Sequence, residues 1–396
     1  MTRRKKVLVA GAGIGGVCVA ALLAKARHEV VVFEQAPVLG EVGAGIQLSA
    51  NGVKVLQHLG LSDALEKFGV RPEQYVFRLY NSGEILQSFR LADEHQRRNG
   101  APYYQVHRAD IHGALVEALD KNAPGCVRLN AQVTSFQEQG GGISIKLADG
   151  RSEEGDLVIG ADGVKSAVRR QILGDTPARF TGQSAWRMVI PASRLPAGFM
   201  EKVMTVWVGP GKHAVMYYLR GGELVNFVGC VDSPDWTDDS WTVRAPWEDL
   251  RADFAEGWHD DVLTFIDAAE RDECFRWGLY NRPPVEHWSL GRATLLGDAC
   301  HATLPYMAQG AVMAIEDGAV LLRSLDREDE VSSALQLYQR NRIPRTAKIV
   351  NESSDNAQLF HLPTELALRA AFASRNIGAE RNDWLFSYDA LSIELE

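Results

Sequence analysis

Three glycines near the start of the chain have the spacing that a dinucleotide site requires. Gly11, Gly13 and Gly16 follow the apolar run 7–10 in the pattern G-x-G-x-x-G. Gly11 allows a tight turn, Gly13 lets the backbone approach a pyrophosphate, and Gly16 lets a helix pack closely against a strand. The free N–H groups at the start of that helix can bind phosphates. This spacing therefore predicts a dinucleotide-binding turn.

The residues after the glycines complete a strand–helix–strand unit. Residues 17–23 are apolar and predict a helix, and the Val-rich run 29–33 predicts a second strand. Glu34 ends that strand, where a carboxylate can accept hydrogen bonds from ribose hydroxyls. The adjacent Gln35 is a further candidate for cofactor binding. Two alternatives are a βαβ unit without a ligand and, because residues 3–6 are basic, a signal peptide. The combination of glycines, second strand and terminal acid argues against both.

Composition limits the kinds of partner that the chain can have. The 396 residues carry a net charge of −9, which disfavours nucleic acid as a partner because phosphate binding needs a basic face. The 5 cysteines are dispersed without a CxxC pair, which is typical of reduced thiols in a cytoplasmic protein. The first apolar run is interrupted by glycines and is a poor membrane span. We expect a cytoplasmic protein without a membrane partner.

The remaining pattern predicts an α/β fold whose dinucleotide-binding part is interrupted by a β-rich insertion. Helices are expected over 52–68, 111–119, 247–266 and from about 298 to 370. Strands are expected over 75–86, 133–137, 143–147, 157–159, 186–231 and 293–296. The polar segment 90–100 is expected to be a loop.

Three further segments carry groups suited to a flavin. Asp162 and Gly163 follow one predicted strand, and Asp298 follows Gly297 after another, so its carboxylate can accept from ribityl hydroxyls. Gln309, Gly310 and Ala311 open an Ala-rich helix, whose N–H groups can stabilise negative charge at the flavin N1–C2=O locus. Arg108 is a candidate clamp for the pyrophosphate. The alternatives are a helix cap for Asp298, a tight turn for Gly310 and a surface position for Arg108.

Together these motifs resemble the single-component flavoprotein aromatic hydroxylases, the para-hydroxybenzoate hydroxylase superfamily. The GxGxxG, DG and GD motifs occur in the expected order between residue 7 and about residue 345. Segments 43–51 and 277–284 resemble the branch of salicylate, 3-hydroxybenzoate and 6-hydroxynicotinate hydroxylases. The resemblance implies a Rossmann-like FAD-binding domain with C-terminal helices (1–75, 102–178 and 284–396). It also implies an inserted β-sheet substrate domain (76–101 and 179–283).

The resemblance also implies the reaction. NADH or NADPH would reduce FAD, and reduced flavin and O₂ would form a C4a-hydroperoxide that hydroxylates a small aromatic acid. In the family the DG segment serves both FAD and the pyridine nucleotide, and Pro305 lies near the reactive face of the flavin. Salicylate is the first substrate hypothesis, 3-hydroxybenzoate the second and 6-hydroxynicotinate the alternative. A flavin oxidase or dehydrogenase and a flavin-bound sensor are other classes, and a homodimer is one open oligomeric state.

The segment 211–219 supplies the candidate catalytic base. Alternation along this strand-like segment places His213 and Tyr217 on one face, and family members carry a similar pair there. A histidine is suited to remove a phenolic proton, which makes the ring more nucleophilic. The alternative is a strand-edge histidine beside a Gly-Pro-Gly turn. Gln47, Trp186 and Tyr306 are the further substrate-binding candidates.

Overall fold

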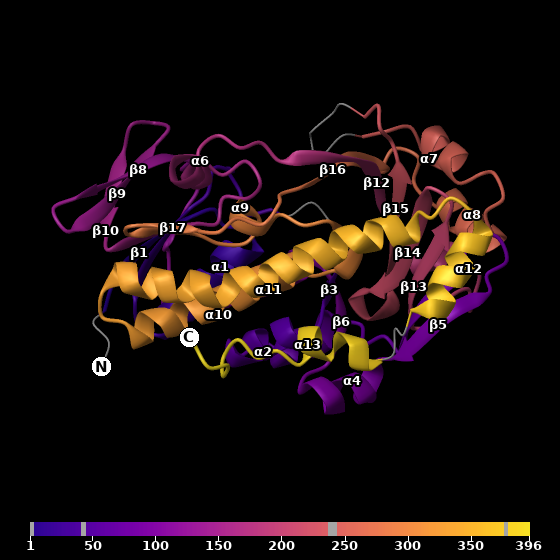
Figure 1. Cartoon of the computed structure of the whole chain (residues 1–396), viewed down its shortest axis with the longest axis horizontal. Helices are drawn as coiled ribbons and strands as arrows, with labels where there is room; N and C mark the ends of the chain where they lie inside the picture. The colour runs from indigo at the N-terminus through magenta and orange to yellow at the C-terminus, as the bar shows by residue number, and fades with distance from the viewer. Residues whose placement is uncertain (1–3, 41–44, 237–243, 376–378) are drawn as a thin grey trace.

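A six-stranded sheet forms one end of the molecule in the computed structural model, which describes residues 4–40, 45–236, 244–375 and 379–396 (Figure 1). The strand order is β17-β18-β11-β1-β2-β7, and every pair except β17–β18 is parallel. The strands are β1 (Lys6–Ala10), β2 (Glu29–Phe33), β7 (Val127–Arg128), β11 (Leu157–Gly160), β17 (Ser289–Leu290) and β18 (Ala293–Leu295). The strands β1, β2 and β11 are Val- and Leu-rich because a parallel sheet is buried on both faces.

Helices cover this sheet and connect it to the rest of the chain. Helix α1 (Ile14–Lys25) is almost entirely buried and packs between α5 (Arg108–Asn122) and α10 (Gly310–Arg327). Helix α11 (Val331–Phe360) packs on α10 and runs along the length of the molecule toward the second large sheet (Figure 1). Helices α2 (Ala50–His58) and α3 (Ser62–Phe68) fall in the predicted helical region 52–68.

A seven-stranded sheet forms the other end, in the order β16-β12-β15-β14-β13-β4-β5. Its strands are β4 (Gln74–Leu79), β5 (Ile85–Arg90), β12 (Arg179–Pro191), β13 (Met204–Gly209), β14 (Lys212–Leu219), β15 (Leu224–Asp232) and β16 (Phe275–Asn281). Side chains of one face pack with α7 (Trp247–Asp253) and α8 (Asp260–Asp267). The other face packs with the end of α11 and with α12 (Glu365–Ser374).

Two small sheets complete the strands of the described residues. The predicted hairpin is confirmed as β8 (Val133–Gln139) and β9 (Gly142–Leu147), joined by β10 (Ser152–Gly155). Strand β3 (Gly45–Leu48) pairs with β6 (Tyr104–His107) and carries Gln47.

The prediction of a loop over 90–100 is wrong, because this segment contains helix α4 (Ala92–Asn99). Two acidic residues lie in its first turn and two basic residues in its last turn, which complements the helix dipole. The helix docks through the buried His95 and ends at Gly100, whose φ is 86°. A polar pattern therefore concealed a helix with only a narrow buried face.

The architecture confirms the predicted α/β class with an inserted β-sheet and a C-terminal helical region. Shorter helices include η3 (Pro305–Met307), α6 (Ala167–Leu173), α9 (Asp298–His301) and α13 (Asp383–Phe386). No helix in the described ranges has both the length and the apolar character needed to span a membrane. The exact division into two domains stays a prediction.

Candidate active site

The predicted cofactor-binding residues come together at one edge of the six-stranded sheet. Gly11 follows β1, Glu34 follows β2, Asp162 lies just beyond β11, and Asp298 lies just beyond β18. These four strands are neighbours and parallel, so their carboxyl ends share an edge. Ligands of such sheets bind outside the carboxyl ends of the strands.

The glycine turn has room for a ligand at one position and none at two others. Gly11 has a φ of 98°, and a Cβ there would clash with the carbonyl oxygen of Ala161. A Cβ on Gly16 would clash with the carbonyl oxygen of Gly11. A Cβ on Gly13 would meet no described atom within 4 Å. Gly13 is also the N-cap of α1, so the open space lies where helix N–H groups can receive a pyrophosphate.

Glu34 and a histidine of α5 both contact the backbone of the glycine turn. The Glu34 carboxylate accepts hydrogen bonds from the N–H groups of Ala12 and Ala36, each at 2.9 Å. Arg108 is the first residue of α5, and one turn later Nε2 of His112 lies 2.7 Å from the carbonyl oxygen of Ala12. No motif marked His112. The predicted Gln35 is exposed next to Glu34.

The DG and GD segments take different positions at the sheet edge. The Asp162 carboxylate accepts from the N–H of Ala167 at 2.7 Å and from the Ser166 hydroxyl, so it caps α6. Gly163 has a φ of 72° and leaves the turn open. Asp298 opens α9, and its side chain is exposed at the sheet edge.

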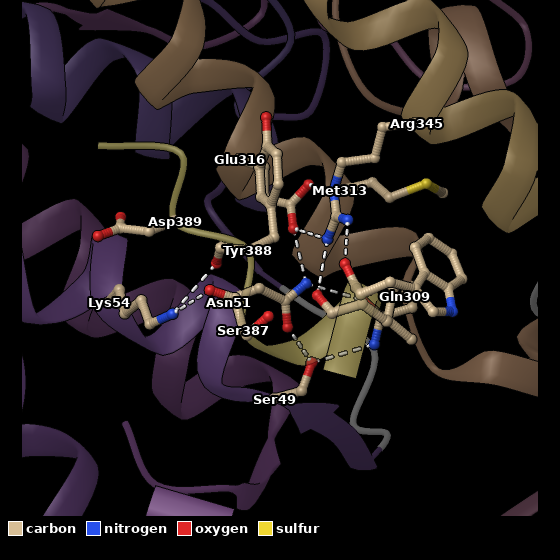
Figure 2. A network of polar contacts seen from close by, with 12 residues as sticks. Ser49, Asn51, Lys54, Gln309, Met313, Glu316, Arg345, Ser387, Tyr388 and Asp389 are labelled. Carbon is tan, nitrogen blue, oxygen red and sulfur yellow. Dashed lines mark hydrogen bonds and ion pairs between the residues drawn. The ribbon is translucent and has the colours of Figure 1, made fainter. Parts of the chain in front are cut away.

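A buried polar cluster contacts the residue before the first turn of α10 (Figure 2). Nε2 of Gln309 donates to Oγ of Ser49 at 3.0 Å, and Oε1 of Gln309 accepts from Asn51 at 3.0 Å. Both polar atoms of the Gln309 side chain thus form hydrogen bonds within the protein. The half-buried Gly310 and Ala311 form the first turn of α10, and their N–H groups are the ones suited to a flavin.

Three buried ion pairs extend this cluster from α10 to α11, and one of them joins Arg342 to Glu316 at 2.8 Å. Asn51 donates to Oε1 of Glu316 at 2.6 Å, and Arg345 pairs with the same oxygen at 2.7 Å (Figure 2). Arg342 pairs with Asp317 at 2.7 Å. Burial alone would raise the pKa of Glu316, but Arg345 and Arg342 outweigh it and lower that pKa.

Asp317 also joins α10 to the GD segment. Its Oδ2 lies 2.6 Å from Nε2 of His301 and accepts from the N–H of Gly297 at 3.1 Å. The position of His301 is thus structural, since its ring joins α9 to α10.

A second polar group surrounds Tyr217 on β14. Tyr103 donates to Oε1 of Gln47 at 2.5 Å, and Nε2 of Gln47 donates to Sδ of Met204 at 3.8 Å. The N–H of Gly45 donates to Asn226 at 2.8 Å, and a Cβ on Gly45 would lie 2.6 Å from the Tyr217 hydroxyl oxygen. Burial raises the pKa of Tyr217, so its hydroxyl stays protonated. Residues 43–44 of the segment 43–51 lie outside the described residues.

His213 lies on the same face as Tyr217, as the alternation predicts, but belongs to a separate group. Its Nδ1 lies 2.8 Å from Nε2 of His361, and its ring centroid lies 4.9 Å from that of Tyr306. Burial, followed by the neighbouring His361, holds the pKa of His213 well below its usual value. The ring is therefore neutral at pH 7. Pro305, before Tyr306, is exposed.

Trp186 lies on the opposite face of the seven-stranded sheet from His213 and Tyr217. Its indole Nε1 donates to Oδ2 of Asp253 at 2.7 Å, and its ring packs with the α7 and α8 side of the sheet. Successive strand residues point to opposite faces. Arg187 therefore faces the Tyr217 side instead, with its guanidinium 5.0 Å from the ring centroid of Trp277.

A cavity lies beside these groups and opens to solvent. Aromatic side chains that line it include Tyr75, Phe89, Tyr103, Tyr306, Phe360 and Phe386. Arg375 and Arg381 line it as well, and Arg375 donates to Asn356 at 2.7 Å. Burial and then Arg381 lower the pKa of Arg375 to about 10, which keeps it a cation at pH 7. Tyr103 and Tyr306 line the cavity and also contact predicted site residues, Gln47 and His213 respectively.

The sequence matches the family described as FAD binding domain over residues 4–353. The chain belongs to this family. It is 38% identical over 395 residues to a 3-amino-4-hydroxybenzoate 2-monooxygenase of Streptomyces platensis, covering 99% of this chain and 98% of the relative. It is 36% identical over 400 residues to a 6-hydroxynicotinate 3-monooxygenase of Pseudomonas fluorescens, covering 100% and 98%. A 3-hydroxybenzoate 6-hydroxylase of Polaromonas naphthalenivorans is 35% identical, covering 90% and 88%.

Solved structures agree with this assignment. Klebsiella pneumoniae HpxO, complexed with FAD and uric acid, superposes with a TM-score of 0.85 at 29% identity, covering 98% of this chain and 96% of that one. A salicylate hydroxylase substrate complex shares the fold, with a TM-score of 0.81 at 24% identity and coverage of 98% and 96%. The predicted class is confirmed: the chain is a flavoprotein aromatic monooxygenase, and its cofactor is FAD.

Proposed function

We propose that this flavoprotein hydroxylates a small aromatic acid that carries a ring hydroxyl, with NADH or NADPH as the electron donor. The cavity beside Tyr103 and Tyr306 is the observation that carries the proposal. Its aromatic walls suit a flat ring, while Arg375 and Arg381 suit a carboxylate. The relatives named after 3-amino-4-hydroxybenzoate, 6-hydroxynicotinate and 3-hydroxybenzoate all act on such a molecule by their names, which supports the same substrate class here.

The residues at the sheet edge fit FAD. The open space at Gly13 and the start of α1 would receive the pyrophosphate, and Glu34 would lie at the ribose. The exposed Asp298 would hold the ribityl chain, and the first turn of α10 would face the flavin ring. Bound FAD, reduced by the nicotinamide, supplies the activation of O₂.

The protein's own contribution is to orient the aromatic ring and take up its phenolic proton. His213 is neutral and buried, so its ring can take up the phenolic proton only if it passes a proton on. The Tyr217 hydroxyl, which stays protonated, can donate a hydrogen bond to a substrate oxygen.

A substrate panel tests the proposal. FAD-loaded protein would receive salicylate, 3-hydroxybenzoate, 6-hydroxynicotinate or 3-amino-4-hydroxybenzoate with NADH or NADPH under ¹⁸O₂. We expect at least one acid to accelerate nicotinamide oxidation and to yield a product containing one ¹⁸O atom. Loss of CO₂ from salicylate would identify oxygen entry at the carboxyl-bearing carbon. The matched control is the primary amide of the same acid, which the arginines should bind more weakly.

Two outcomes would contradict the proposal. Nicotinamide oxidation that gives only hydrogen peroxide with every acid would favour an oxidase. Turnover of the amide as fast as the acid would exclude the arginine-lined cavity as the carboxylate site.

A further inference from the structure

Three side chains form a continuous path from the buried His213 to solvent. Nδ1 of His213 lies 2.8 Å from Nε2 of His361, and Nδ1 of His361 lies 2.7 Å from Oδ1 of Asp232. The His361 side chain is 4% exposed, whereas that of Asp232 is 51% exposed. The members come from β14, from the end of α11 and from the end of β15, so the path exists only in the folded chain.

The contact of His361 with Asp232 favours one arrangement of ring protons over the alternative, in which Nε2 of Gln183, 3.0 Å from Nδ1 of His361, donates to that nitrogen. The Asp232 carboxylate only accepts, so Nδ1 of His361 is the donor toward it. A neutral His361 then has its lone pair on Nε2, and Nδ1 of His213 must donate to it. The lone pair of His213 is thereby left on Nε2, which has no hydrogen-bond partner among the described residues.

The surroundings keep the outer end of the path ionised. Burial alone would raise the pKa of Asp232, but His361, Gln183 and Lys212 outweigh it and hold that pKa below its usual value. Gln183 donates to Oδ1 of Asp232 at 3.0 Å and accepts from Tyr306 at 2.6 Å. The other titratable groups facing the path are Tyr306, on the cavity side, and Cys230, on β15. Burial raises the pKa of both, so they remain neutral.

We propose that His361 and Asp232 are positioning residues that hold His213 as a base and carry its proton to solvent. When Nε2 of His213 takes the phenolic proton, its Nδ1 proton moves to Nε2 of His361. The Nδ1 proton of His361 moves to Asp232 and then to water. One proton enters at His213 and one leaves at Asp232, so both histidines end neutral and the only new charge is the negative charge of the phenolate. This inference rests on the proposed function for the source of the proton.

The first test compares Asp232→Asn with the wild type in single-turnover reactions between pH 6 and pH 9. The amide oxygen can still accept from His361, but the amide cannot take up a proton. We expect hydroxylation to slow about 10- to 100-fold near pH 6–7, the range in which the phenol needs a base. The deficit should shrink as pH approaches the solution pKa of the substrate, while flavin reduction changes less than about twofold. Asp253→Asn, on the opposite face of the sheet, is the matched control and should leave this profile unchanged.

A loss of rate that is equal at every pH, or no loss, would overturn the path. His361→Gln should give the same pH-dependent deficit, and its FAD content shows whether the variant folds.

The second test does not depend on turnover. Ring ¹⁵N NMR of histidine-labelled, FAD-loaded protein should show both His213 and His361 protonated on Nδ1 at pH 7.5. A proton on Nε2 of His361 would overturn the inference. If no aromatic acid is hydroxylated in the panel, the proposed function fails, whereas this spectrum still decides whether the path exists.

Discussion

At the scale of single residues, the three glycines of the first turn have different structural roles. A side chain on Gly16 would meet the backbone of Gly11, whereas one on Gly13 would enter open space. Packing of the strand and helix thus depends on Gly16, and access of a ligand depends on Gly13. The structure thus agrees with the motif in separating a folding role for Gly16 from a binding role for Gly13.

We predict that Gly13→Ala and Gly16→Ala lose FAD for different reasons. Gly13 has a φ of −68°, which alanine adopts freely, so Gly13→Ala should weaken FAD binding about tenfold or more and leave the apoprotein stable. Gly16→Ala should lower the melting temperature of the apoprotein, because overpacking costs about 1–3 kcal/mol. Calorimetry of both apoproteins and FAD titration check this. Equal melting temperatures for the two variants would contradict it.

The site also shows which residues a sequence can reveal. Glycine spacing predicted the cofactor edge because the turn, the helix start and the second strand are local in sequence. His213 and Tyr217 were identifiable because strand alternation places them on one face. His361 and Asp232 were not, since their contacts with His213 join distant segments and neither residue lies in a motif. Trp186 shows the reverse limit, because alternation alone does not say which face of the sheet meets the cavity.

At the scale of elements, a buried histidine ring is one of the contacts that dock helix α4. The N–H of Ala50 on α2 lies 3.4 Å from Nε2 of His95, and the His95 ring contacts Tyr103 and Phe386 edge-on. Burial and then the nearby Lys54 lower the pKa of His95 to about 4. The docking of α4 therefore requires a neutral ring. The sequence showed the charges of this helix but not the neighbours that bury its histidine.

We predict that acid loosens α4 before the rest of the molecule. Between pH 6.5 and about pH 4 the unfolded chain protonates His95 and the folded chain does not, so folded stability falls as pH falls. The full loss from this residue is about 3 kcal/mol. In urea unfolding, His95→Gln should lose less stability than the wild type over this pH range. Parallel stability curves for the two proteins would contradict the prediction.

The buried pairs between α10 and α11 lead to a second prediction at this scale. Glu316→Gln leaves Arg345 buried without its carboxylate and should cost about 3–5 kcal/mol of unfolding free energy. Asn51 also loses its charged acceptor, so the contact of Asn51 with Gln309 at the start of α10 should loosen. Chemical denaturation and FAD affinity measure the two effects. Glu352→Gln on α11 is the control, because its pair with Lys348 is only partly buried and has a separation of 3.9 Å.

At the scale of the whole molecule, the last residues of the chain fasten α10 to α11. The Tyr388 ring lies 3.7 Å from the Arg345 guanidinium carbon, within the ion-pair cluster (Figure 2). Arg323 on α10 donates to the carbonyl oxygen of Ala390 at 3.1 Å, and Asn341 on α11 donates to that of Glu396 at 3.0 Å. The tail thus supports the helix that faces the flavin.

We predict that a chain ending at Ser387 melts at a lower temperature and releases FAD more readily. It loses the cation–π contact of Tyr388, worth about 0.5–2 kcal/mol, and the hydrogen bonds to the tail. A chain ending at Ile393 keeps Tyr388 and is the matched control. Flavin fluorescence during heating reports FAD release. Release at the same temperature from both chains would show that Tyr388 does not support the flavin helix.

The interleaving of the two large sheets has a consequence for how the protein is made. The sheet edge that binds the cofactor is built from β1, β2, β11 and β18, and the last of these ends at Leu295. Strand β4 pairs in parallel with β13, which begins at Met204. Synthesis proceeds from the N-terminus. Most of the chain must therefore leave the ribosome before either sheet is complete. Until then the early strands have unpaired edges, which a chaperone can protect.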